Sequence, residues 1–163
     1  MTNQKELLVK MVLDMWHSRI AQIDKIISEI SDEKLMTEIA PGKNRGIYIL
    51  GHLIAVNDKM PTLFVNSAIL PLFPALYSTF FANPDKLVTD IPSVLEIKTY
   101  WKEVNSMIEK YFNSLTTDEW FQKHNSISTE EFAKEPNRNK LNIIISRTNH
   151  MSYHLGQLTL LLK

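Results

Sequence analysis

Two histidines four residues apart, His150 and His154, lie near the end of the chain in the segment NHMSYHLGQLTLLLK. Four residues advance an α-helix by about one turn, so both imidazoles leave the same face, offset by roughly 40°. A third histidine, His52, lies far upstream in the segment GHLIAVND. Two imidazoles stacked in this way can share one metal ion, and a third from a facing helix would complete the set.

A set of three histidine ligands leaves coordination positions open. This is typical of catalytic zinc sites, where water or substrate takes the open position, whereas structural zinc sites are closed by four protein ligands. Imidazole also binds nickel, copper and iron, so the ligand types alone do not identify the metal. A metal bound here would lower the pKa of a coordinated water or thiol and so create a nucleophile near neutral pH.

The composition excludes several other kinds of site. The chain has 163 residues and no cysteine, which removes disulfides, thiolate ligands and a cysteine nucleophile. Its 18 basic and 18 acidic residues balance, so it lacks the positive excess that binds nucleic acid. The sequence contains neither the apolar core of a signal peptide nor an apolar run of ~18 residues that would span a bilayer. We therefore expect a cytoplasmic protein that binds neither nucleic acid nor membrane.

Apolar residues recur at three- and four-residue steps, which is typical of amphipathic helices. We predict helices over residues 3–30, from 44–47 to about 60, over 93–115 and over 139–162. The first should bury a stripe formed by Leu8, Val12, Met15, Ile23, Ile26, Ile27 and Ile30. The third should bury Val94 or Leu95, Ile97, Trp101, Val104, Ile108 and Phe112. These helices predict an all-α fold, a four-helix bundle with long loops, in one domain spanning residues 1–163.

Two local signals mark the ends of these helices. Ser93 and Glu96 have the spacing of a capping box at the start of the third helix. Pro61 should kink the second helix or end it near Met60, because proline lacks the N–H that a continuing helix needs.

The connections between the helices are long. Residues 66–91 contain three prolines, which exclude one continuous helix, yet many of their side chains are large and apolar. Such a connection either covers one end of the domain or contacts another subunit, and the second alternative predicts a homodimer. Residues 116–137 are polar and irregular, with one short helical turn expected at 117–119.

The helical pattern also predicts where the histidines point. On a helical wheel His150 and His154 share a strip with Ile143 and Leu161, and His52 lies at the edge of the apolar stripe of its own helix. All three should therefore face inward. Three inward histidines can be separately satisfied core residues, but unpaired buried imidazoles are costly, which favours a shared ion.

Four further polar residues are candidates for lesser roles. We predict that His17 and His124 lie at the surface. Asp58, six residues after His52, should make a surface pair or contact a ligand rather than bind metal itself. Arg147, one turn before His150, either binds an anionic group of a substrate or extends its charge toward solvent.

Taken together, these features resemble the DinB-like superfamily of DinB and YfiT-type proteins. The resemblance rests on PGKNRGIYILGHL from Pro41 to Leu53, on the pattern HxxxHxGQL from His150 to Leu158, and on four helices across the chain. It implies an antiparallel four-helix bundle with a divalent metal, often zinc or nickel. One histidine of the second helix and two of the fourth hold that metal, which correspond here to His52, His150 and His154.

The resemblance also implies a range of activities. Members include S-transferases that use bacillithiol, mycothiol or glutathione, together with metal-dependent isomerases and hydrolases, and many are dimers. We therefore expect a metal-dependent thiol S-transferase or hydrolase that acts on a small molecule, with a low-molecular-weight thiol as co-substrate. The alternative is a non-catalytic metal-binding or dimeric interaction bundle linked to stress, because no general base is evident beside the three histidines.

Overall fold

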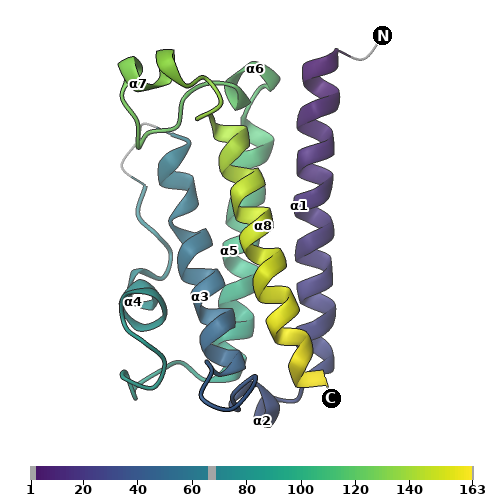
Figure 1. Cartoon of the computed structure of the whole chain (residues 1–163), viewed down its shortest axis with the longest axis vertical. Helices are drawn as coiled ribbons and strands as arrows, with labels where there is room; N and C mark the ends of the chain where they lie inside the picture. The colour runs from purple at the N-terminus through teal and green to yellow at the C-terminus, as the bar shows by residue number, and fades with distance from the viewer. Residues whose placement is uncertain (1–2, 66–68, 163) are drawn as a thin grey trace.

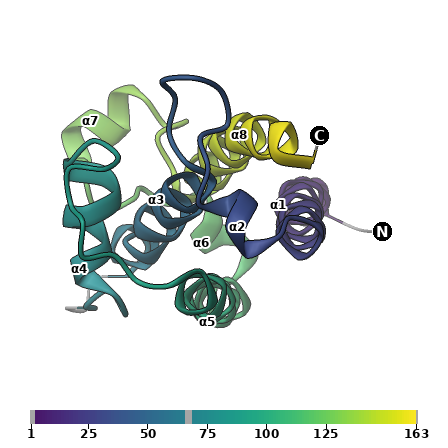
Figure 2. The same cartoon turned by 90° about the horizontal axis from the view of Figure 1, so that it is seen from below.

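The computed structural model describes residues 3–65 and 69–162, and over these ranges the chain is all-α, as predicted. Its four long helices are α1 (Gln4–Glu29), α3 (Gly46–Asp58), α5 (Val94–Ser114) and α8 (Lys140–Leu158). They lie side by side along the long axis of the molecule (Figure 1) and surround a common interior when seen end-on (Figure 2). Helix α3 contacts both α5 and α8, and α1 packs against α8.

Short helical elements fill the connections. They are α2 (Asp32–Leu35), the 3₁₀ turn η1 (Met60–Leu63), α4 (Pro74–Tyr77), the π-helical turn η2 (Ser78–Ala82), α6 (Thr117–Trp120), α7 (Thr129–Lys134) and the 3₁₀ turn η3 (Thr159–Leu162). The turn expected at 117–119 is α6, whereas α2, α4, η2 and α7 were not predicted. Pro61 ends the second helix rather than kinking it, since α3 stops at Asp58 and Pro61 lies in the first turn of η1.

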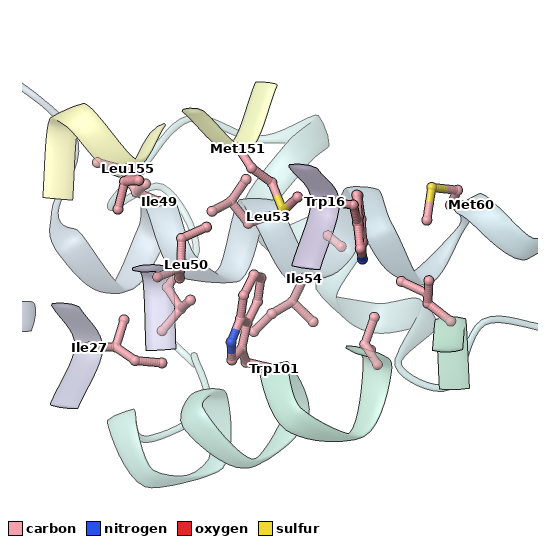
Figure 3. Packing of buried hydrophobic residues seen from close by; sticks show 14 of the residues in the cluster. Trp16, Ile27, Ile49, Leu50, Leu53, Ile54, Met60, Trp101, Met151 and Leu155 are labelled. Carbon is pink, nitrogen blue, oxygen red and sulfur yellow. The ribbon is translucent and has the colours of Figure 1, made fainter. Parts of the chain in front are cut away.

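The core is built where the four long helices meet. Side chains from each of them come together there, including Trp16 of α1, Leu53 of α3, Trp101 of α5 and Met151 of α8 (Figure 3). Helix α5 begins with the predicted capping box between Ser93 and Glu96 and buries the predicted stripe. The indole N–H of Trp101 also donates a 2.7 Å hydrogen bond to the carboxylate of Asp24 on α1, which fixes the contact between these two helices.

The buried face of α1, with its C-cap residue Ile30, contains five of the seven predicted residues, Val12, Ile23, Ile26, Ile27 and Ile30, and differs from the prediction at two. Leu8 and Met15 are 45% and 56% exposed, whereas Val9 and Trp16, one residue further along, are buried. The helix is rotated so that its largest side chain, Trp16, enters the core and packs edge-on against Phe112, with the ring centroids 5.6 Å apart. Burial of the large Trp16 ring favours this orientation, because aromatic side chains remove a large apolar area from water.

The apolar connection, described over residues 69–91, packs against α3 of its own chain. Leu76 and Phe80 are buried, and Phe73 stacks on Tyr100 of α5 with the ring centroids 4.0 Å apart. The carboxylate of Asp58 holds the start of this segment, because it accepts hydrogen bonds from the backbone N–H groups of Leu72 and Phe73 at 2.9 and 2.8 Å. The prediction of a surface role for Asp58 was therefore wrong: the residue is 2% exposed.

Gly51 makes room for this connection, which leads to a first prediction. A Cβ atom at Gly51 would lie 2.6 Å from the ring of the buried Phe80. We expect Gly51→Ala to lower the free energy of unfolding by ~1 to 3 kcal/mol, because Phe80 and η2 would have to move outward. Urea denaturation measures the change. Gly156→Ala is the matched control, since a Cβ there meets nothing within 4 Å and alanine favours the helix; equal destabilisation of the two variants would contradict the prediction.

No helix within the described residues is long and apolar enough to cross a bilayer.

Candidate metal centre

Helices α3 and α8 bring the three predicted histidines together. His52 lies halfway along α3, and His150 and His154 lie one turn apart on the facing part of α8. The Nε2 atom of His150 is 3.1 Å from Nε2 of His52 and 3.0 Å from Nε2 of His154. One ligand atom of each residue lies within 4.8 Å of those of the other two, and each side chain is half-buried.

These distances fit a single bound ion. Two nitrogens that are each 2.0–2.1 Å from one zinc ion lie about 2.9 Å apart at a right angle and about 3.3 Å apart at the tetrahedral angle. The separations of 3.0 and 3.1 Å fall between these values. Two of the three pairs therefore have the spacing of ligands on one ion, and the ligand atoms of the third pair, His52 and His154, lie within 4.8 Å of each other.

Hydrogen bonds at the opposite ring nitrogens orient two of these histidines. Nδ1 of His52 lies 3.0 Å from the carbonyl oxygen of Phe80, and Nδ1 of His154 lies 2.7 Å from Oε1 of Gln157. Because both oxygens are acceptors, each Nδ1 carries the proton and each Nε2 keeps its lone pair. Such outer contacts are what fixes the tautomer of a metal-bound histidine.

His150 has no such partner in the described part of the chain. Its Nδ1 atom is buried without a hydrogen bond. Burial, followed by the neighbouring charges of His154, His52 and Arg147, lowers the pKa of His150 from 6.5 to about 4. Burial is also the main cause that lowers the pKa of His52 and of His154. All three imidazoles are therefore neutral at pH 7, the form that binds metal.

This protonation pattern predicts that the metal-free protein loses stability in mild acid. His150 titrates at about 4 in the folded chain but near 6.5 when unfolded, so between these values the unfolded chain binds more protons. The free energy of unfolding should therefore be highest above pH 6.5 and fall as the pH drops from 6.5 toward 4. Urea titrations of chelator-treated protein across this range measure the slope. His150→Gln should show a shallower slope, and an unchanged slope would contradict the assignment.

A cavity of about 180 Å³ lies directly beside the histidines. It is lined by Asn44, Tyr48, Ile49, His52, Phe81 and His154. The ring of Phe81 stacks almost parallel to that of His52, with the centroids 5.6 Å apart, and forms one wall. The Tyr48 hydroxyl donates to the Asn83 carbonyl at 2.7 Å and so ties α3 to the end of the apolar connection. A small molecule in this cavity would contact His52 and His154 directly.

The remaining candidates lie outside the cluster. His17 is exposed, as predicted, and pairs with Glu109 at 2.9 Å. The surface prediction for His124 was wrong, because His124 is 7% exposed and its Nδ1 lies 2.8 Å from the Ser126 hydroxyl. Its segment is held down by Asn125, whose backbone N–H donates to the Leu63 carbonyl at 3.0 Å. Such a long-range contact leaves no periodic signal in the sequence.

Sequence reasoning also missed residues that support the site. Gln157 lies three residues after His154, which is one helical turn, so its contact could have been found from spacing alone. The Phe80 carbonyl and the Phe81 ring come from η2, and no local pattern indicates that this segment reaches His52.

Comparison with known proteins adds no assignment: no protein-family model matches this chain, and no curated protein matches it.

Proposed function

We propose that His52, His150 and His154 hold a divalent metal, zinc or nickel, and that the protein is a metal-dependent enzyme acting on a small molecule. A thiol-dependent S-transferase or a hydrolase fits the site best. The observation that carries the proposal is the convergence of three neutral imidazole nitrogens, 3.0 and 3.1 Å apart, beside a cavity of about 180 Å³. Three-histidine sites leave room for water or substrate on the metal.

The chemistry follows from this arrangement. A divalent ion at this site would lower the pKa of a coordinated thiol or water and so supply a nucleophile near pH 7. The Phe80 carbonyl and Gln157 keep the Nε2 atoms of His52 and His154 directed at the site. Phe81 and Ile49 provide apolar walls that limit water around the reacting group. A thiol brought by a co-substrate suits a chain that has no cysteine.

The proposal extends to family and architecture. We propose membership in the DinB-like superfamily, with an antiparallel four-helix bundle formed by α1, α3, α5 and α8 and a cytoplasmic location. Support comes from the positions of the ligands, one on α3 and two on α8, which match the arrangement that the motifs imply. A homodimer stays a prediction that sedimentation tests. The apolar connection now gives it less support, because Leu76 and Phe80 are buried within their own chain.

The second candidate function is a non-catalytic metal-binding or interaction bundle linked to stress. One observation favours it. Among the described residues, the group of side chains that could hold a metal consists of the three histidines and contains no carboxylate. No separate general base therefore lies within this group. A metal-bound hydroxide would make such a base unnecessary.

An activity screen separates the two functions. Metal-loaded and chelator-treated protein would be incubated with electrophiles and with several thiols, and with ester and amide substrates. We expect turnover that requires the metal and is lost in His150→Ala/His154→Ala. Metal binding without turnover on any of these substrates would favour the non-catalytic bundle.

A further inference from the structure

A second cavity adjoins the metal centre and has a different character. Its volume is about 280 Å³, and it is lined by Val56, Lys59, Thr62, Leu63, Tyr77, Phe81 and Arg147. Phe81 lines both cavities, and its ring stacks on Tyr77 with the centroids 4.5 Å apart as well as on His52. The two cavities are therefore neighbours that share one aromatic wall.

Arg147 is the unusual residue of this cavity. Its side chain is half-buried, and burial lowers the pKa of its guanidinium, which nevertheless stays charged in proteins. No hydrogen bond or ion pair joins it to any residue of the described ranges. The other three arginines have partners: Arg19 bonds Gln22, Arg45 binds Asp85 through two nitrogens, and Arg138 lies 3.6 Å from Glu131.

A partly buried guanidinium without a counter-ion is costly, because its charge loses water without gaining a partner. Arg45 provides the comparison, because its partly buried guanidinium is paired with the carboxylate of Asp85. At Arg147 no described residue takes the place that Asp85 has beside Arg45, and the side chain lines a cavity instead.

The rest of the lining is also suited to an anion. Lys59 lies in the same cavity, with its ammonium 3.0 Å from the centre of the Tyr77 ring, and none of the described lining side chains is acidic. The neighbouring Asp58 is directed away, toward the backbone of Leu72 and Phe73. The remaining walls are mostly apolar, which favours a ligand with one anionic group on an organic body over a free, fully hydrated ion.

We infer that Arg147 binds the carboxylate of an organic substrate whose other end reaches the metal centre. The planar guanidinium offers two parallel N–H donors that match the two oxygens of a carboxylate. Arg147 and His150 are three residues apart on α8, so their Cβ atoms are separated by about 5 to 6 Å. A short acid can span that gap. The reach to the metal rests on the proposed function, whereas carboxylate binding by Arg147 does not.

The test uses defined probes and nitrogen-15 NMR titrations. Butyrate, butyramide and inorganic phosphate are titrated into metal-free protein, and 3-mercaptopropionate and its amide into zinc-loaded protein. We expect the acids to bind in preference to the amides. Arg147→Gln should weaken acid binding at least about tenfold and remove the preference, while Arg147→Lys keeps only part of it. Arg138→Gln, which removes an arginine outside the cavity, is the matched control and should bind as the wild type does.

The outcomes separate the two proposals. If butyrate binding depends on Arg147 but zinc does not bind, the carboxylate subsite stands and the metal proposal fails. If zinc binds in the wild type and in Arg147→Gln alike, yet neither acid distinguishes the two proteins, the carboxylate subsite is wrong. Tighter binding of phosphate than of butyrate would also overturn the assignment of a carboxylate. Circular dichroism and thermal unfolding of Arg147→Gln confirm that any loss of binding is not a loss of fold.

Discussion

Replacing His150 and His154 together by alanine will abolish binding of zinc or nickel by the purified protein. The wild type should carry a stoichiometric ion after reconstitution, measured by mass spectrometry of the metal, because three imidazole nitrogens converge at 3.0 and 3.1 Å. An ion that binds only the folded state also stabilises it, by about 2.7 kcal/mol when its free concentration is a hundred times Kd. Thermal unfolding should therefore shift upward with metal in the wild type and not in the variant.

His17→Ala is the control for this experiment, since His17 is an exposed histidine paired with Glu109 on the outside of the molecule. It should retain the ion and the thermal shift. Retention of a full complement of metal by the double variant, or no binding by the wild type after treatment with zinc and nickel, would show that the three histidines are core residues.

Asp58→Ala should destabilise the protein by ~2 to 4 kcal/mol, because two backbone N–H groups would lose a buried charged acceptor. The carboxylate of Asp58 holds Leu72 and Phe73 and so anchors the segment that leads to Phe80 and Phe81. The Phe80 carbonyl orients His52, so we also expect metal affinity to fall by about tenfold, as is typical when an outer contact of a ligand is disturbed. Urea denaturation and competition with a metal indicator measure the two effects.

Asp90→Ala provides the comparison, since Asp90 is an exposed carboxylate of the same connection. Its effect on stability should stay within about 0.5 kcal/mol, as for most surface substitutions. Equal stability of the two variants would mean that Asp58 does not anchor the connection.

Local periodicity was enough to predict much of this protein. The stripe of α5 and its capping box follow from residues three and four apart, because helix geometry alone decides which of them share a face. The pairing of His150 with His154 has the same origin, since one helical turn brings their Nε2 atoms to 3.0 Å. The end of the second helix near Pro61 was predicted as one of two alternatives, because the missing N–H acts within one turn.

Only the tertiary structure decided the features that depend on how helices rotate and which segments meet. His52 is 98 positions from His150 along the chain, and α3 must face α8 with the correct rotation for their nitrogens to approach within 3.1 Å. The same rotations bury Trp16 in place of Met15. Among the residues that the structure describes, they also leave Arg147 without a hydrogen bond or ion pair, in a cavity that Phe81 of the apolar connection helps to line. Packing free energy is shared among many non-local contacts, so no single stretch of sequence contains the signal for these arrangements.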